Sequence, residues 1–208
     1  MSYDAFIFDL DGTIIDSELI GLKTLQATLS EQGIDKSLDE LRFSIGIPGL
    51  STLEVLNVAD IPTTLALWIR KQKPLMKEVP IFADMIEVIE QLPKTGIVTS
   101  QTGAELRCGF NLLKVDHHFQ AIVCADDTER HKPNPEPLEL GLKLLRCRAD
   151  EAIYIGDSVY DLQCAQSAGV DFGLALWGAK TTDGFESADY IFETPRDILN
   201  LCSHEEHV

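Results

Sequence analysis

Two aspartates, two residues apart, follow a short apolar run near the N-terminus. The run Ala5–Phe8 is continuously apolar and precedes the segment Asp9–Thr13, which reads DLDGT, so it predicts a buried strand that ends at the carboxylates. Carboxylates gathered at one point can serve as nucleophile, as general acid and base, or as ligands of a hard cation. Acidic residues also form ordinary turns after strands, so the pair gains meaning only from its partners.

Three further polar segments follow predicted buried strands. Thr99–Thr102 carries hydroxyl groups before a helix, Arg130–Pro135 carries Lys132, and Gly156–Asp161 carries two more aspartates. Because the carboxyl ends of parallel strands meet at one edge of a sheet, these segments are expected to converge with Asp9–Thr13. Carboxylates, a hydroxyl and one ammonium group at four strand ends predict a site for a hard metal ion and a phosphate group.

The second half of the chain alternates between predicted strands and helices. The predicted strands are Ala5–Phe8, Gly96–Thr99, Ala121–Ala125, Ala152–Ile155, Phe172–Leu176 and a short edge strand Tyr190–Phe192. The predicted helices are Asp84–Leu92, Gly103–Lys114, Glu136–Cys147, Val159–Ala168 and Pro195–Cys202. This alternation is typical of an α/β fold, a doubly wound, Rossmann-like parallel sheet covered on both faces.

A helical stretch separates the first strand from the rest. Leu19, Leu22, Leu25 and Leu29 recur at helical spacing, and further helical segments are predicted over Leu38–Phe43, Leu50–Asn57 and Thr63–Lys73, where Pro74 is expected to end or kink the last helix. The stretch is too long for an ordinary βα connection. It predicts an inserted all-helical cap domain at 15–79 on a core formed by 1–14 and 80–208, although a plain helical subdomain is the alternative.

Composition narrows the classes of function. The chain has 208 residues, 45% of them hydrophobic and 25% charged, with a formal net charge of −17. Such an acidic chain argues against binding to nucleic acid or to an anionic membrane. The five scattered cysteines form no disulfide or zinc pattern, and no leader or membrane-spanning run is evident, so reduced thiols and a cytoplasmic location are expected. The sequence predicts no oligomeric state.

The four segments resemble a known set of motifs. Asp9–Thr13, Ile97–Ser100, Lys132-Pro133 and Gly156–Asp161 are similar, in order, to the signature motifs of the haloacid dehalogenase superfamily. The helical insert resembles the C1-type cap of its phosphoglycolate phosphatase and β-phosphoglucomutase subgroup. The resemblance implies a Mg²⁺-dependent phosphatase that hydrolyses a small phosphate monoester, a small phosphorylated metabolite, through an aspartyl-phosphate.

The resemblance also implies roles for the acidic residues. Asp9 is expected to be the nucleophile, and Asp11 the general acid and then the base that activates water. Asp157 is expected to hold Mg²⁺ together with the Asp9 carboxylate and the backbone carbonyl of Leu10 or Asp11. The dehalogenase branch lacks an aspartate at the position of Asp11, which favours phosphoryl chemistry. Asp161 either supports the metal, orients Lys132 or simply complements the helix dipole.

The remaining expected site residues bind phosphate, position other groups or contact substrate. Thr99 is expected to donate to a phosphoryl oxygen and Lys132 to neutralise charge as a point cation. Ser158 is either a group that supports the metal or a helix N-cap. The other expected phosphate or substrate contacts are Ser100, Gly12 and Thr13 in the core and Arg42 and Gly46 in the cap.

Two rival functions remain open. A phosphomutase of the β-phosphoglucomutase type presents a histidine in the first cap helix, and the matching segment Ile20–Leu22 contains none. A catalytically idle phosphate-binding protein does not need both Asp9 and Asp11. Both observations favour transfer of the phosphoryl group to water.

Overall fold

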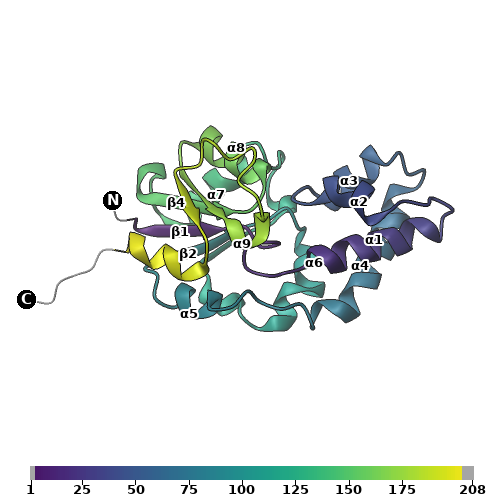
Figure 1. Ribbon diagram of the computed structural model, residues 1–208, viewed down its shortest axis with the longest axis horizontal. Helices are drawn as coiled ribbons and strands as arrows, with labels where there is room; N and C mark the ends of the chain where they lie inside the picture. Colours follow the sequence, from purple (N-terminus) through teal and green to yellow (C-terminus); the bar gives the residue numbers. More distant parts are fainter. Residues whose placement is uncertain (1–2, 203–208) are drawn as a thin grey trace, which may run out of the picture.

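Six parallel strands form one sheet in the order β3-β2-β1-β4-β5-β6 (Figure 1). The computed structural model describes residues 3–202. The strands are β1 Ala5–Phe8, β2 Thr95–Val98, β3 Ala121–Val123, β4 Ala152–Gly156, β5 Asp171–Ala175 and β6 Tyr190–Phe192. The chain winds outward from β1 to β3 and then crosses back to β4, so the direction of winding reverses between β1 and β4. In doubly wound sheets, ligands bind beyond the strand ends at such a reversal.

Helices cover both faces of the sheet, and alternate residues of each strand point to opposite faces. Phe6 and Phe8 pack into one core with α5, α6 and the C-terminal 3₁₀ helix, whereas Ala5 and Ile7 pack into the other with α7 and α8. The helices of this core are α5 Met85–Ile89, α6 Gly103–Cys108, α7 Glu136–Leu145, α8 Val159–Ala168 and α9 Leu176–Ala179. The predicted α/β fold is confirmed.

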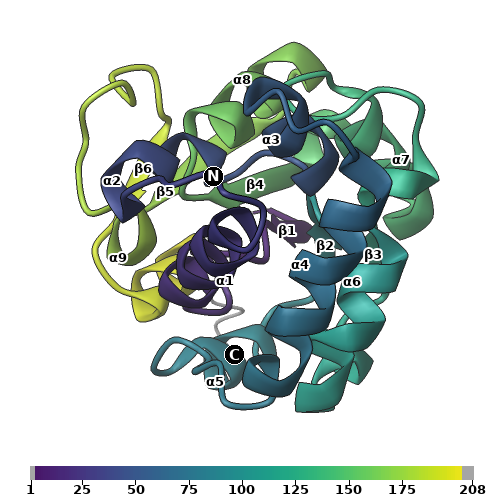
Figure 2. The ribbon, with the colours of Figure 1, turned by 90° about the vertical axis from the view of Figure 1, so that its right-hand side faces the viewer.

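The N-terminal insert is entirely helical. Its helices are α1 Glu18–Ser30, α2 Leu38–Leu41, α3 Gly49–Val55 and α4 Ile61–Met76. Three of the four helically spaced leucines, Leu22, Leu25 and Leu29 of α1, pack with Trp68 of α4 in a separate small core, whereas Leu19 is exposed. Figures 1 and 2 show these helices on one side of the molecule, in front of the end of the sheet at which the site residues lie.

Two neighbouring segments of chain connect the insert to the sheet. Ile15, on the way out, pairs with Ile81, on the way back. The Asp16 N–H donates to the Pro80 carbonyl at 2.9 Å, and the Phe82 N–H to the Ile14 carbonyl at 3.0 Å. The division into a cap at 15–79 and a core at 1–14 and 80–208 remains our proposal, and it places the boundary at these paired crossings.

Several predicted boundaries were wrong. The helix expected over Gly103–Lys114 ends at Cys108, and a 3₁₀ helix over Phe110–Leu113 follows it. Gly109 leaves helical geometry at this point, where a Cβ atom would lie 2.8 Å from Met76 Cε, so the packing of α4 against this turn determines the break. Helix α4 continues two residues past Pro74, because a proline in the last turn removes only one late backbone bond. The closing helix Pro195–Leu201 is a 3₁₀ helix.

Candidate active site

Lys132 lies beneath the end of β1 as a buried cation. Its ammonium nitrogen Nζ donates to Asp9 Oδ1 at 2.9 Å, to Asp161 Oδ1 at 2.6 Å and to the Tyr154 hydroxyl at 3.2 Å. Its side chain is 1% exposed. Burial by itself lowers the pKa of a lysine, but the charges of Asp161 and Asp9 raise the pKa of Lys132 above its ordinary value. Lys132 therefore stays charged and binds the two carboxylates together.

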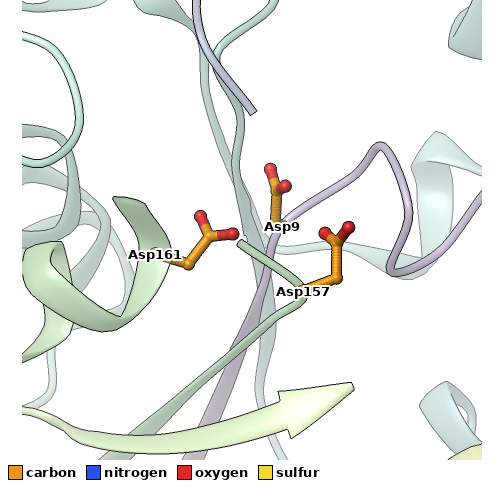
Figure 3. Close-up of side chains that lie close together, drawn as sticks. All are labelled: Asp9, Asp157 and Asp161. Carbon is orange, nitrogen blue, oxygen red and sulfur yellow. The ribbon is translucent and has the colours of Figure 1, made fainter. Parts of the chain in front are cut away.

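Three carboxylates crowd the point where β1 and β4 end (Figure 3). Oxygen atoms of Asp9, Asp157 and Asp161 lie within 4.8 Å of one another, and all three residues are buried. Burial, followed by the charge of Asp161, raises the pKa of Asp9 to about 7, and burial together with the Asp9 charge raises the pKa of Asp157. Like charges in a buried site cost free energy that a bound cation removes.

The hydrogen bonds of the group distinguish the two carboxylates that keep a free oxygen, Asp9 and Asp157, from Asp161, whose two oxygens are both engaged. Asp161 Oδ1 accepts from Lys132 and from the Tyr154 hydroxyl, and its Oδ2 accepts from the backbone and side chain of Ser158. Asp157 accepts only from Thr13 Oγ1, at 3.2 Å, among the described residues. Asp9 and Asp157 therefore keep oxygen atoms free, and this all-oxygen donor set fits a hard cation. Asp161, by contrast, fixes Lys132 and caps α8.

Asp11 accepts hydrogen bonds from two side chains that do not contact the other carboxylates. Gln101 Nε2 donates to Asp11 Oδ2 at 2.7 Å, and the hydroxyl of Ser17 donates to Asp11 Oδ1. Burial raises the pKa of Asp11, and the hydrogen bonds from Ser17 and Gln101 oppose this rise. The Asp11 carboxylate is thus held in place by two side chains. Its side chain does not belong to the group of three carboxylates, and a role for Asp11 in metal binding remains a prediction.

Sequence reasoning missed Ser17, Gln101, Tyr154 and Gly178. Ser17 occupies the N-cap position of α1, yet its side chain makes no cap bond and donates to Asp11 instead. Gly178 of α9 packs against the loop of Asp11 so tightly that a Cβ atom there would lie 1.8 Å from the Gly12 carbonyl oxygen. No local sequence signal marks these residues, because each contact depends on the approach of distant segments.

Gly12 and the hydroxyl residues Thr99 and Ser100 follow the ends of β1 and β2. Gly12 adopts φ +79°, where a Cβ atom would lie 2.2 Å from Asp157 Oδ2, so only glycine fits beside this carboxylate. Thr99 is buried, and its Oγ1 accepts from the Gln101 N–H at 3.1 Å. Ser100 Oγ donates to the Gly46 carbonyl at 3.1 Å. This last bond joins the core to the cap across the site.

A cavity of about 130 Å³ lies between the core and the helical insert. Asp9, Asp11, Asp157 and Ser100 line it from the core, and Gly46 lines it from the insert. Arg42, the other expected cap contact, does not line this cavity. It is largely exposed, and its guanidinium pairs with Glu18, the first residue of α1, at 2.6 Å.

These features define a class of protein, the capped α/β hydrolases that act on small phosphorylated substrates. The features are the doubly wound sheet, the clustered carboxylates with their buried lysine, and the helical insert. A family profile described as haloacid dehalogenase-like hydrolase matches residues 6–175. The chain belongs to the haloacid dehalogenase-like hydrolases, as the four motifs indicated.

Relatives that span the whole chain carry more specific names. Pyrophosphatase PpaX of Bacillus velezensis is 30% identical over 95% of both chains. A protein of Caldanaerobacter subterraneus named as a candidate pyrophosphatase PpaX is 31% identical, covering 100% of this chain and 99% of its own. The crystal structure of a candidate phosphoglycolate phosphatase from Lactobacillus plantarum matches with a TM-score of 0.88 at 30% identity, covering 97% of this chain and all of that one.

Within residues 3–202, no helix is both long and apolar enough to span a bilayer. The five cysteines are all free thiols.

Proposed function

We propose that the protein is a Mg²⁺-dependent phosphatase that hydrolyses a small phosphate monoester through an aspartyl-phosphate on Asp9. The observation that carries this proposal is the placement of Asp9 and Asp11 in one cavity, each held by different partners. Lys132 fixes the Asp9 carboxylate, so its geometry favours attack on phosphorus. Ser17 and Gln101 fix the Asp11 carboxylate, which in its protonated form can donate to the leaving oxygen.

The proposed reaction has two steps. In the first, an Asp9 oxygen forms a bond to phosphorus while the ester oxygen leaves with the proton of Asp11. In the second, Asp11 accepts a proton from water, and the water oxygen replaces Asp9 on phosphorus. Asp9 and Asp157 would hold the Mg²⁺ ion, which supplies positive charge against the phosphoryl oxygens. Thr99 and the amide groups near Ser100 are proposed to contact those oxygens.

Inorganic pyrophosphate is a second candidate substrate. It is favoured by the names of relatives that match over 95% or more of this chain. Phosphomutase activity is less well supported, because the expected position of a cap histidine falls on Ile20–Leu22, and Gly21 lines the cavity there without a side chain. The full set of Asp9, Asp11 and Asp157 also counts against an idle phosphate-binding protein.

Release of inorganic phosphate tests the proposed activity. The protein should release phosphate from small phosphate monoesters when Mg²⁺ is present and should lose this activity in EDTA. Conversion of a hexose 1-phosphate to its 6-phosphate, in the presence of the bisphosphate, would instead indicate a mutase. Failure to release phosphate from any ester in the panel, with the metal bound, would refute the proposal.

Mg²⁺ should stabilise the protein through Asp157. A ligand that binds only the folded state stabilises it by about 2.7 kcal/mol at a hundred times its Kd, so Mg²⁺ should raise Tm. Metal ligands must be deprotonated, and the pKa of Asp9 is raised to about 7. The increase in Tm should therefore grow as pH rises through about 7. Calorimetry with and without Mg²⁺ measures it.

Asp157→Asn should abolish most of this increase in Tm. Asp171→Asn makes the same kind of change at the first residue of β5, at the edge of the sheet away from the site. This variant should retain the Mg²⁺ response. An equal response to Mg²⁺ in the wild type and in Asp157→Asn would exclude Asp157 as a ligand.

A further inference from the structure

The cavity wall contains acidic side chains and no basic ones. Within the described part of the chain, five carboxylates line the cavity, and none of the lining residues is Lys, Arg or His. Lys132 lies below Asp9 and is engaged by Asp9 and Asp161. With Mg²⁺ bound as proposed, the charges of the metal and Lys132 balance those of Asp9, Asp157 and Asp161. No cation of the lining remains for a second anionic group of the substrate.

Glu105 carries an open carboxylate oxygen on the core side of the cavity. Its Oε2 accepts from the Thr102 N–H and hydroxyl, both at 2.7 Å. Its Oε1 has no hydrogen bond or ion pair among the described residues and points toward the cap, 3.3 Å from where a Cβ atom on Gly49 would stand. A negative group on a bound ligand would meet this oxygen across the cavity.

Two exposed cations pair with a carboxylate of the cavity lining. Glu18, another lining residue, pairs with Arg42 at 2.6 Å and with Lys180 at 3.0 Å. Arg42 and Lys180 are both largely exposed, and neither of them lines the cavity. These pairs neutralise Glu18 but leave the cavity without excess positive charge.

Apart from the Gln72 amide, the hydrogen-bond donors of the lining side chains are also used. The hydroxyls of Ser17, Ser44 and Ser100 donate to Asp11, to the Leu41 carbonyl and to the Gly46 carbonyl. The Trp68 indole donates to Thr24 Oγ1 at 3.1 Å. The acceptors are in surplus instead.

One of these acceptors is buried without a partner. Gln101 directs its Nε2 to Asp11, which leaves its Oε1 as the one buried side-chain polar atom without a hydrogen bond in residues 3–202. An unsatisfied buried acceptor costs free energy until a donor reaches it. Glu105 Oε1, by contrast, is an open acceptor on a residue that lines the cavity, where a ligand that brings a donor gains and an anionic ligand loses.

We infer that the substrate's leaving group is a small alcohol that carries no negative charge and presents a hydrogen-bond donor, a hydroxyl or an ammonium group. This inference rests on the proposed phosphatase activity and separates this chain from the pyrophosphate and phosphoglycolate named for its relatives. The apolar side chains of Leu22, Ile47 and Met76 line the same cavity and fit the carbon skeleton of such an alcohol. Glu105 is the residue that selects against an anion.

Four two-carbon phosphate esters test the inference because they differ only at the far end. Hydroxyethyl phosphate, aminoethyl phosphate, ethyl phosphate and phosphoglycolate end in a hydroxyl, an ammonium, a methyl and a carboxylate group. Calorimetry with Asp9→Asn and Mg²⁺ measures their binding without turnover, at about pH 8, well above the ordinary range of carboxyl groups. Pyrophosphate is the fifth ligand.

The two donor-bearing esters should bind at least about tenfold more tightly than phosphoglycolate and pyrophosphate, because a like charge facing a carboxylate is costly. A stronger response to the ammonium than to the hydroxyl ester would identify an amino alcohol, and the reverse a polyol. Equal or tighter binding of either anionic ligand, or no binding of any of the five, would overturn the inference.

Glu105→Gln removes the open negative charge and nearly preserves shape. The affinity for phosphoglycolate relative to hydroxyethyl phosphate should rise about tenfold in this variant. Asp126→Asn is the matched control, since Asp126 accepts from the Gly103 N–H at the same end of α6 but does not line the cavity. An unchanged ratio in Glu105→Gln would refute the assignment of Glu105.

Turnover of the same esters by the wild-type protein separates the two proposals. The expected order of kcat/KM follows the order of binding. If the donor-bearing esters bind best but release no phosphate, the phosphatase proposal fails while the assigned ligand class stands. If phosphoglycolate is hydrolysed fastest, the phosphatase proposal stands and the inference fails.

Discussion

Asp9→Asn should reduce kcat by a factor on the order of 10⁴ or more, as removal of a nucleophile does in other enzymes with covalent intermediates. An amide nitrogen or oxygen cannot replace the carboxylate oxygen that attacks phosphorus. The wild-type protein, quenched in acid during turnover of a ³²P-labelled ester, should carry an acid-stable, hydroxylamine-sensitive phosphate. Asp9→Asn should carry none.

Two controls keep this result interpretable. Asp4→Asn makes the same change at the opposite, exposed end of β1, where the backbone of Asp4 pairs with Glu151, and it should retain full activity. Because the amide side chain of the Asp9→Asn variant still offers an oxygen to Lys132, the thermal unfolding of this variant should stay cooperative. Substantial turnover by a folded Asp9→Asn protein would show that another residue is the nucleophile.

The convergence of Asp9, Lys132 and Asp157 could be predicted from sequence because it follows from general rules. Asp9 and Asp157 directly follow strongly apolar strands and Lys132 lies in the loop after β3, and parallel strands bring their carboxyl ends to one edge. The residues that meet there are 123 positions apart in the case of Asp9 and Lys132, yet their atoms lie 2.9 Å apart. The continuous apolar runs predict where each strand lies, and the end of a strand determines where the residue that follows it is placed.

Other parts of the site depend on packing that no local pattern encodes. Tyr154 reads as an ordinary core residue of β4, yet its hydroxyl contacts both Lys132 and Asp161. Arg42 was expected near substrate from its charge and position, but the acidic Glu18 competes for it. Asp161 had three open roles, and its contacts show that it binds Lys132 and also takes part in the cap of α8. These contacts depend on how closely distant helices and strands approach one another, which the local sequence does not show.

Lys132→Met should destabilise the fold as well as the reaction. Lys132 and its partners Asp9 and Asp161 are almost completely buried, with side chains exposed by 1%, 4% and 0%. Removal of one partner from a buried ion pair typically costs about 3–5 kcal/mol, because the other charge remains buried without compensation. Chemical denaturation should show a loss of this size, and activity should fall by about 10²-fold or more as the charge facing the phosphoryl group disappears.

A second variant separates the two effects. Lys132→Met combined with Asp161→Asn removes one positive and one negative charge, so fewer uncompensated charges remain buried and part of the lost stability should return. Activity should not return, because the cation beside Asp9 is still missing. If the double variant recovers activity together with stability, Lys132 supports the fold alone and contributes nothing to the chemistry. If Lys132→Met is as stable as the wild type, the buried network is not the electrostatic support that its geometry indicates.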